Sequence, residues 1–136
     1  MSPESVAAED YRRLLEFRTG IRRFLKWSAD RAKEAGLTPA QHQLLLAVKG
    51  HDDAAGPTIS DVAEYLQLRH NSTVELIDRA EHLGLVRRVT DSEDARLVRL
   101  QLTEDGDTRL KGLAHQHLRE LERLAAHISQ LWAGLD

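Results

Sequence analysis

The stretch TISDVAEYLQLRHNSTVELIDRAEHLGLVRRVTDSEDARLVRLQLTEDG, residues 58–106, decides the fold of this chain. Apolar residues first recur at the three-four spacing of two short helices, and then alternate as they do in strands, on both sides of a charged turn. The pattern predicts a helix opened by Thr58, a second helix over about 70–83, strands over 85–90 and 96–102, and a new helix after Thr103. That order is typical of a helix-turn-helix with a β-hairpin wing, a unit whose second helix fits the major groove of DNA.

Helix starts are marked by capping residues. Thr58 has Asp61 three residues later, and Thr38 has Gln41 at the same distance with Pro39 in the first turn. Both are the capping-box spacing, in which the two side chains each bind the other's backbone N–H. Thr103 is followed by acidic residues that suit the positive end of a helix.

Long apolar stripes flank this unit on both sides. They predict a helix over 8–35, stopped near Gly36, and another over 104–135 that could break into two. A head of this size cannot bury both stripes, so we expect them to pair with a second subunit. The alternative is a monomer whose terminal helices fold back on the head. The expected dimer-interface residues are Leu14, Ile21, Leu121, Leu124, Ile128 and Leu131.

Composition narrows the function classes. With 136 residues, 30% charged and 41% hydrophobic, one soluble domain is expected, and no apolar run approaches the ~20 residues that span a bilayer. No secretion signal is recognisable and no Cys is present, which predicts a cytoplasmic protein without thiol chemistry. The net charge of −3 is low for a DNA-binding protein, but local charge decides such contacts. The bases between Arg69 and Arg99 are interspersed with acids, which predicts clear salt dependence and weak non-specific binding.

From Leu37 to Gly106 the chain resembles the MarR family of transcriptional regulators. The matching segments are LTPAQHQLLLAVKG (37–50), STVELIDRAEHLGLVRR (72–88) and DSEDARLVRLQLTEDG (91–106). The most diagnostic part is Asp94-x-Arg96 followed by the helix start Leu102-Thr103-x-x-Gly106. The long terminal helices fit the same family, so the resemblance covers nearly the whole chain.

The resemblance implies a mainly α fold with a small β-hairpin wing (α+β). It implies a single domain over 1–136, with a winged helix-turn-helix head over 37–103 and dimerisation helices over 8–35 and 104–135. It also implies an obligate homodimer on a pseudo-palindromic double-stranded DNA operator, and we expect a repressor released by a small anionic or aromatic effector. Two alternatives stay open: a winged-helix protein-interaction module without DNA binding, and a DNA binder that has no effector.

The start and outer face of the second helix of the pair carry the side chains that we expect to contact DNA. Asn can read adenine, Arg can read guanine, and Ser or Thr usually hold phosphate. Asn71 and Ser72 could instead cap the helix, Asp78 is better explained by a structural ion pair, and Thr73 also falls on the inward face. The expected contacts are Arg69, His70, Asn71, Ser72, Thr73, Glu75 and Arg79.

In the wing, the resemblance places Arg96 in the minor groove or on its phosphates, with Asp94 orienting the guanidinium or the turn. Such an arginine reads the shape of the groove. The alternative is a solvated charged turn.

The seven histidines raise the question of metal binding. His51-Asp52-Asp53 is better explained by a solvated loop, and His115 and His117 lie two apart, unlike the i, i+4 pairs that clamp a metal. His117 is better explained by an interface. No catalytic triad is expected from Ser72, His70 and Asp78, because they share one helix without a nucleophile turn. The sequence therefore predicts no cofactor, no metal and no enzyme activity.

The family binds effectors in the crevice between the head and the long helices. Trp27, Arg31 and His42 are the residues that we expect to line it, and packing with surface charge is the alternative.

Overall fold

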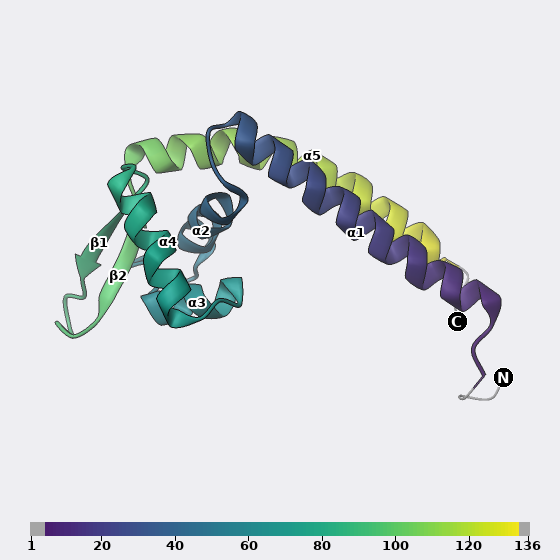
Figure 1. Cartoon of the computed structure of the whole chain (residues 1–136), viewed down its shortest axis with the longest axis horizontal. Coiled ribbons are helices and arrows are strands. Elements are labelled where there is room, and N and C mark those ends of the chain that lie inside the picture. The colour runs from purple at the N-terminus through teal and green to yellow at the C-terminus, as the bar shows by residue number, and fades with distance from the viewer. Residues whose placement is uncertain (1–4, 134–136) are drawn as a thin grey trace.

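Two long helices form an arm that projects from the head in the computed structural model, which describes residues 5–133 (Figure 1). These helices, α1 (Ala8–Glu34) and α5 (Glu104–Trp132), run side by side. The head holds α2 (Pro39–Gly50), α3 (Ile59–Leu66), α4 (His70–His82) and an antiparallel hairpin of β1 (Val86–Thr90) and β2 (Val98–Leu102). The prediction of a mainly α fold with a small β wing is confirmed, as is the order of the elements.

The predicted caps set the starts of α2 and α3. The Thr58 hydroxyl accepts the Asp61 amide at 3.2 Å, and the Asp61 carboxylate accepts the Thr58 amide at 2.9 Å. Thr38 and Gln41 repeat this reciprocal arrangement at 3.1 and 3.0 Å. Each box satisfies two N–H groups that would otherwise lack partners at a helix end.

One core joins the three helices of the head, the hairpin and the first turns of α5. Its buried apolar side chains come from α2, α3, α4, both strands and Leu85 between α4 and β1, with Ala32 from the end of α1, and Leu110 and Leu113 of α5 cover them. Burying each leucine removes apolar surface from water, which stabilises the fold by ~2 kcal/mol per side chain. The largest of these fully buried side chains are Leu44, Leu45, Ile77, Leu85 and Leu100.

The segment Leu102-Thr103-x-x-Gly106 fixes α5 on the head. The Thr103 hydroxyl donates to the Gly84 carbonyl at 2.6 Å and accepts the Gly106 amide at 3.0 Å. A Cβ on Gly106 would lie 2.1 Å from the Leu85 carbonyl oxygen, so only glycine permits this close approach. The arm is therefore anchored where α4 leads into β1.

The hairpin pairs Val86 with Leu102 at one end and Thr90 with Val98 at the other. Both strands are shorter than predicted. The Leu85 amide donates to the Ala80 carbonyl at the end of α4, and Leu97 closes the wing turn through bonds with Asp91 and Asp94. These residues therefore end the helix and make the turn.

Both long helices agree with their predicted limits to within a few residues. Helix α1 ends at Glu34, one residue before its predicted end, and Gly36 follows with a φ of +80°. The possible break in the last helix does not occur within its described residues, 104–132. In residues 5–133 no helix is both long enough and apolar enough to span a bilayer.

The expected dimer-interface residues divide into two groups on the arm. Leu14 and Leu121 are exposed to 53% and 43%, whereas Ile21, Leu124, Ile128 and Leu131 are half-buried. Leu124 lies against Gly20, so part of the apolar stripe packs between α1 and α5 of the same chain. The alternative in which the terminal helices fold back on the head is not what the structure shows, because the arm leads away from it (Figure 1).

Candidate functional site

The first turn of α4 presents an exposed polar surface. The side chains of Arg69, His70, Asn71 and Ser72 are exposed, as are Glu75 and Arg79 further along the helix. Within residues 5–133, none of these six side chains makes a hydrogen bond or an ion pair with another residue. Their donors and acceptors are therefore free for a ligand.

Two expectations about this turn need correction. Arg69 is the N-cap residue of α4, and no side chain of residues 5–133 caps the helix, so the capping alternative for Asn71 and Ser72 is wrong. Thr73 is fully buried and its hydroxyl donates to the Arg69 carbonyl at 2.9 Å. Its side chain cannot reach DNA, because it lies on the inward face that the helical spacing also predicted.

An ion-pair cluster ties the end of α4 to the wing. Arg88 of β1 lies 2.6 Å from the Asp78 carboxylate and also binds Glu81. The hydrogen bond with Asp78 is the largest cause that raises the pKa of Arg88 above its ordinary value. The structural ion pair expected for Asp78 is confirmed, and its partner comes from the next element of the fold.

The wing turn carries Arg96 at its surface. Arg96 Nε and Nη2 lie 3.0 and 3.1 Å from the two Asp94 carboxylate oxygens, and the arginine side chain is 90% exposed. The hydrogen bond from Arg96 is the largest cause that lowers the pKa of Asp94 below its usual value. Asp94 therefore orients the guanidinium as expected, and contact with DNA stays a prediction.

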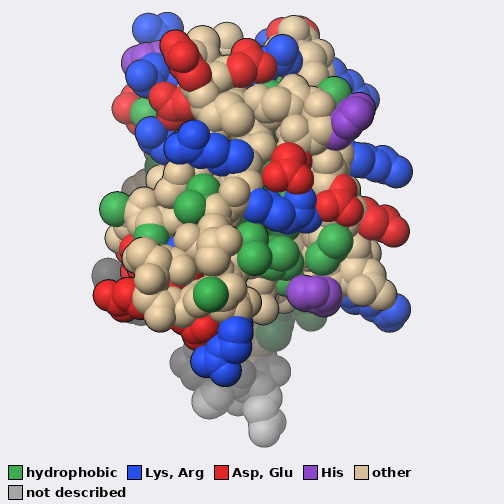
Figure 2. All heavy atoms as spheres, turned by 90° about the vertical axis from the view of Figure 1, so that its left-hand side faces the viewer, with side chains coloured by type: hydrophobic (Ala, Val, Ile, Leu, Met, Phe, Trp, Pro, Cys, Tyr) green, Lys and Arg blue, Asp and Glu red, His purple; other side chains and the backbone are tan. Residues whose placement is uncertain are grey.

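Charge on the hairpin end of the molecule is mixed. Figure 2 shows Lys and Arg side chains interspersed with Asp and Glu over this face. Such a surface has no single strong positive field, so contacts there depend on local geometry. This agrees with the modest basic signal of the sequence.

The three residues expected in the crevice do come together, around a fourth that the sequence did not place there. The His117 ring of α5 lies 4.8 Å from Trp27 and 4.7 Å from His42, measured between ring centroids. The Ser28 hydroxyl is 2.7 Å from His117 Nε2. Arg31 lies over the Trp27 ring at 5.7 Å. Residues of α1, α2 and α5 thus meet at one junction between head and arm.

Open hollows flank this junction on the arm. One, of about 330 Å³, is lined by Arg31 and Arg109, and another, of about 380 Å³, by Trp27 and Arg119. Gly112 and Gln116 line both. Arg31 Nε is buried and finds no hydrogen-bond partner among residues 5–133. His42, with only 3% of its surface exposed, lines neither hollow.

His51 corrects the expectation of a solvated loop. Its side chain is only 10% exposed, Nδ1 lies 2.7 Å from the Tyr65 hydroxyl, and Nε2 lies 3.8 Å from Asp61. Asp52, in contrast, is 97% exposed. The part of the chain that the structure describes contains no group of three or more His, Cys, Asp or Glu residues placed to hold a metal ion.

Comparisons with known proteins agree with this geometry. A sequence model of the MarR family matches residues 35–97. The chain is 29% identical over 79 residues to the HTH-type transcriptional repressor MdtR of Bacillus subtilis (strain 168), covering 58% of this chain and 49% of MdtR. It is 34% identical over 101 residues to the uncharacterized HTH-type transcriptional regulator YfiV of the same organism, covering 71% of this chain and 61% of YfiV. The chain thus spans about half to three fifths of the length of these relatives.

Among solved structures, the S. aureus MepR-DNA complex superposes with a TM-score of 0.69 at 20% sequence identity. The match covers 83% of this chain and 82% of MepR. At that identity, the likeness concerns the fold. The chain belongs to the MarR family. The resemblance found in its sequence is therefore confirmed.

Within this MarR-family head, sequence reasoning missed three residues that organise the site: Arg88, Arg99 and His117 as a junction residue. Arg99 and His117 bind partners 43 and 89 residues away in sequence, Gly56 and Ser28, and Arg88 binds Asp78 of the preceding helix. The only sequence signal was their polarity at positions close to apolar stripes, which does not identify a partner.

Proposed function

We propose that the chain is a sequence-specific, dimeric DNA-binding transcriptional regulator of the cytoplasm, and that it is a repressor. The observation that carries this proposal is the presence of two exposed polar groups on the head, one at the first turn of α4 and one at the wing turn. The first turn of α4 offers unpaired side chains and backbone N–H groups, and the wing turn offers an oriented guanidinium at Arg96. A helix start of this kind suits the major groove, and an arginine on a wing suits a narrow minor groove.

The arm supports the homodimer. Tyr11, Leu14, Leu15 and Leu25 of α1 and Leu118 and Leu121 of α5 are all more than two fifths exposed. Large apolar side chains gathered along two helices are typical of an interface, because water disfavours such a surface on a monomer. A two-fold dimer would place its two α4 helices about one DNA turn apart or a multiple of it, on a pseudo-palindromic operator.

The junction between head and arm supports an effector site. Arg31 and Arg109 line one hollow, Arg119 and Trp27 line its neighbour, and Arg31 Nε has no hydrogen-bond partner within residues 5–133. Guanidinium groups pair with carboxylates, and an indole packs against an aromatic ring. We therefore propose that the effector is a small aromatic acid. Its binding changes the orientation of the head relative to the arm, and the protein then releases the operator.

The names of two similar proteins are consistent with this proposal. MdtR is named a repressor, and MepR has been solved in complex with DNA. Those properties belong to these two proteins, and they support the same function for a chain with the same fold.

The test begins with selection of duplexes from a random library by the purified protein. The enriched duplex is then used in a gel-shift titration at several salt concentrations, with a shuffled duplex as control. We expect preferential binding that weakens steeply as salt rises, because phosphate contacts release counterions. No enrichment, with the protein folded, would favour a protein-interaction module and overturn the DNA-binding proposal.

The effector proposal is tested separately with benzoate, using cyclohexanemethanol as an uncharged, non-aromatic control. Benzoate should release the selected duplex from the wild type and not from Arg31→Gln. Release from neither protein would favour a DNA binder without an aromatic-acid effector.

A further inference from the structure

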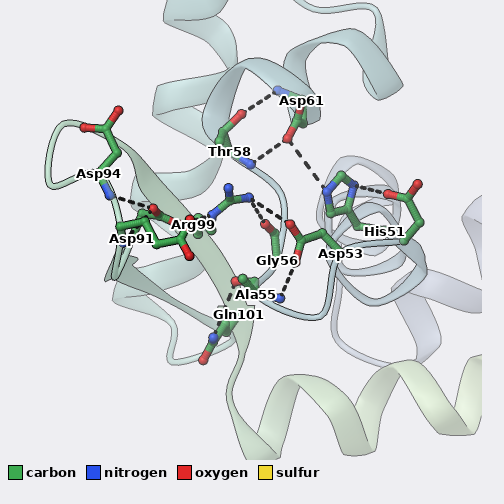
Figure 3. Close-up of polar contacts among 12 residues, drawn as sticks. His51, Asp53, Ala55, Gly56, Thr58, Asp61, Asp91, Asp94, Arg99 and Gln101 are labelled. Carbon is green, nitrogen blue, oxygen red and sulfur yellow. Dashed lines mark hydrogen bonds and ion pairs between the residues drawn. The ribbon is translucent and has the colours of Figure 1, made fainter.

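Arg99 of β2 joins the wing turn to the loop between α2 and α3 (Figure 3). Its Nε donates to the Asp91 carboxylate at 2.7 Å, and its Nη1 donates to the Gly56 carbonyl at 2.9 Å. Asp53 lies 3.8 Å from the same Nη1. The Arg99 and Asp91 side chains are only 18% and 13% exposed. A charge-assisted bond that is largely removed from solvent is less screened by salt than one at the surface.

The same aspartate folds the wing turn. The second carboxylate oxygen of Asp91 accepts the amides of Glu93 and Asp94 at 3.1 and 2.8 Å. The hydrogen bond from Arg99 is the largest cause that lowers the pKa of Asp91, followed by the one from the Asp94 amide. One carboxylate thus holds Arg99 on one side and, on the other, the backbone that carries Asp94 and Arg96.

On its other side, Arg99 is held by a loop that packs directly on β2. The Leu100 amide donates to the Pro57 carbonyl at 2.9 Å, and Thr58 forms an antiparallel bridge with Arg99. Gly56 has a φ of +94°, and a Cβ there would lie 2.0 Å from the Leu100 carbonyl oxygen. The loop is therefore fixed to the strand, and Thr58 in turn caps α3.

A two-stranded hairpin alone is marginally stable in water, and Thr90 and Arg96 at the outer end of this one are exposed. The contacts above give that end a fixed position relative to the head. We propose that Arg99 is a positioning residue of the DNA interface, which ties the wing turn to the α2–α3 loop and so sets where Arg96 stands relative to α4. This inference rests on the proposed function, and Arg99 acts through Arg96 without touching DNA itself.

The experiment is a double-mutant cycle. Operator affinity is measured on the selected duplex for the wild type, Arg99→Gln, Arg96→Ala and the double variant. Arg87→Gln is the matched control, because Arg87 lies on the neighbouring strand and, within residues 5–133, its side chain binds only Gln101. We expect Arg99→Gln to weaken binding about tenfold, or ~1.4 kcal/mol, in the wild type and less than twofold in the Arg96→Ala background.

Other outcomes count against the proposal. If the two losses multiply in the double variant, Arg99 acts independently of Arg96 and the proposal fails. If Arg87→Gln reproduces the whole pattern, loss of charge on the hairpin is the cause and the proposal also fails. If Arg99→Gln unfolds at the assay temperature, Asp91→Asn replaces it, since asparagine can still accept the turn amides but no longer pairs with the guanidinium.

A measurement without DNA separates this inference from the proposed function. In Arg99→Gln, hydrogen exchange at the Asp94 and Leu97 amides should accelerate, while amides in α4 keep their protection. Unchanged exchange in the turn would overturn the positioning role, even if the protein binds DNA. Absence of DNA binding by the wild type, with faster exchange in the variant, would instead overturn the regulator proposal alone.

Discussion

The rings of His42 and His117 lie with their centroids 4.7 Å apart where α2 meets the arm. His117 Nδ1 is 2.9 Å from the Leu113 carbonyl, which can only accept, so Nδ1 carries a hydrogen. Its Nε2 then accepts from the Ser28 hydroxyl when the ring is neutral. His42 differs, because its Nδ1 is buried without a hydrogen-bond partner among residues 5–133.

This arrangement predicts loss of stability in mild acid. Burial, followed by the nearby His117, lowers the pKa of His42 below the ordinary 6.5. As pH falls through that value, unfolded His42 takes up a proton before folded His42 does, so acid favours unfolding. The free energy of unfolding, measured in urea, should therefore fall between pH 7.5 and 5.5.

The variant His42→Leu should show a smaller fall over this pH range than the wild type. His115→Gln is the control, because His115 is exposed on the same arm, and it should keep the wild-type slope. An equal pH dependence in His42→Leu and wild type would contradict the assignment to His42.

Replacement of Arg96 by alanine should weaken operator binding and leave the fold intact. The side chain is 90% exposed and, among the residues that the structure describes, pairs with Asp94 alone, so its removal leaves no buried group unpaired. We expect about a tenfold loss of affinity at moderate salt. Arg12→Ala, on an exposed part of the arm, is the control in the same gel-shift titration. Unchanged affinity in Arg96→Ala, with a native circular dichroism spectrum, would remove Arg96 from the interface.

The variant Asn71→Ala distinguishes two roles of this residue, recognition of a DNA base and capping of α4. Since Asn71 caps no backbone group, the substitution should leave the thermal unfolding midpoint within a degree or two. Binding should instead lose its preference at one base pair of the selected duplex, because asparagine reads adenine through paired hydrogen bonds. Titrations against duplexes with single base-pair changes measure this. A uniform loss over all of them would indicate contact with phosphate.

Local spacing explains which parts of this structure could be predicted. Thr58 and Asp61 are three residues apart, so their capping box follows from helix geometry once the helix start is recognised. Arg88 with Asp78, ten residues apart, depends on the angle at which α4 leads into β1. Arg99 with Gly56 and His117 with Ser28 are separated by 43 and 89 residues. Such pairs depend on tertiary packing, which single-sequence periodicity does not encode.

Thr73 shows that residue type alone can mislead the prediction of a contact even within a single helix. The residue type suggested phosphate binding, whereas the three-four spacing placed it inward with Ile77 and Ala80, and the spacing was right. A small polar residue can be buried when its hydroxyl bonds to a carbonyl of the preceding turn, as Thr73 does.

A charge on the exposed stripe of the arm should disrupt the proposed dimer. Leu121→Glu places a carboxylate at a position that is 43% exposed in the single chain and that we expect to be covered in the dimer. Burying an unpaired charge is unfavourable, so the variant should dissociate at concentrations where the wild type stays dimeric. Sedimentation velocity measures the change. Leu83→Glu is matched in residue type and is 56% exposed at the end of α4, and it should leave the assembly unchanged. A wild type that sediments as a monomer would contradict the dimer itself.

The two glycines that bracket the α2–α3 loop should respond oppositely to alanine. Gly56 has a positive φ, and a Cβ would lie 2.0 Å from a backbone oxygen of β2, which cannot move without breaking the contact between loop and strand. Gly56→Ala should therefore lower the free energy of unfolding by about 2 kcal/mol or more.

At Gly50, the last residue of α2, a Cβ would meet nothing within 4 Å. Alanine there restricts the unfolded chain, so Gly50→Ala should be neutral or raise the free energy of unfolding by up to about 1 kcal/mol. Urea unfolding of both variants in parallel provides the comparison. Equal stability of the two would mean that the loop tolerates a gap at β2, and with it that Arg99 has no fixed partner on that side of the strand.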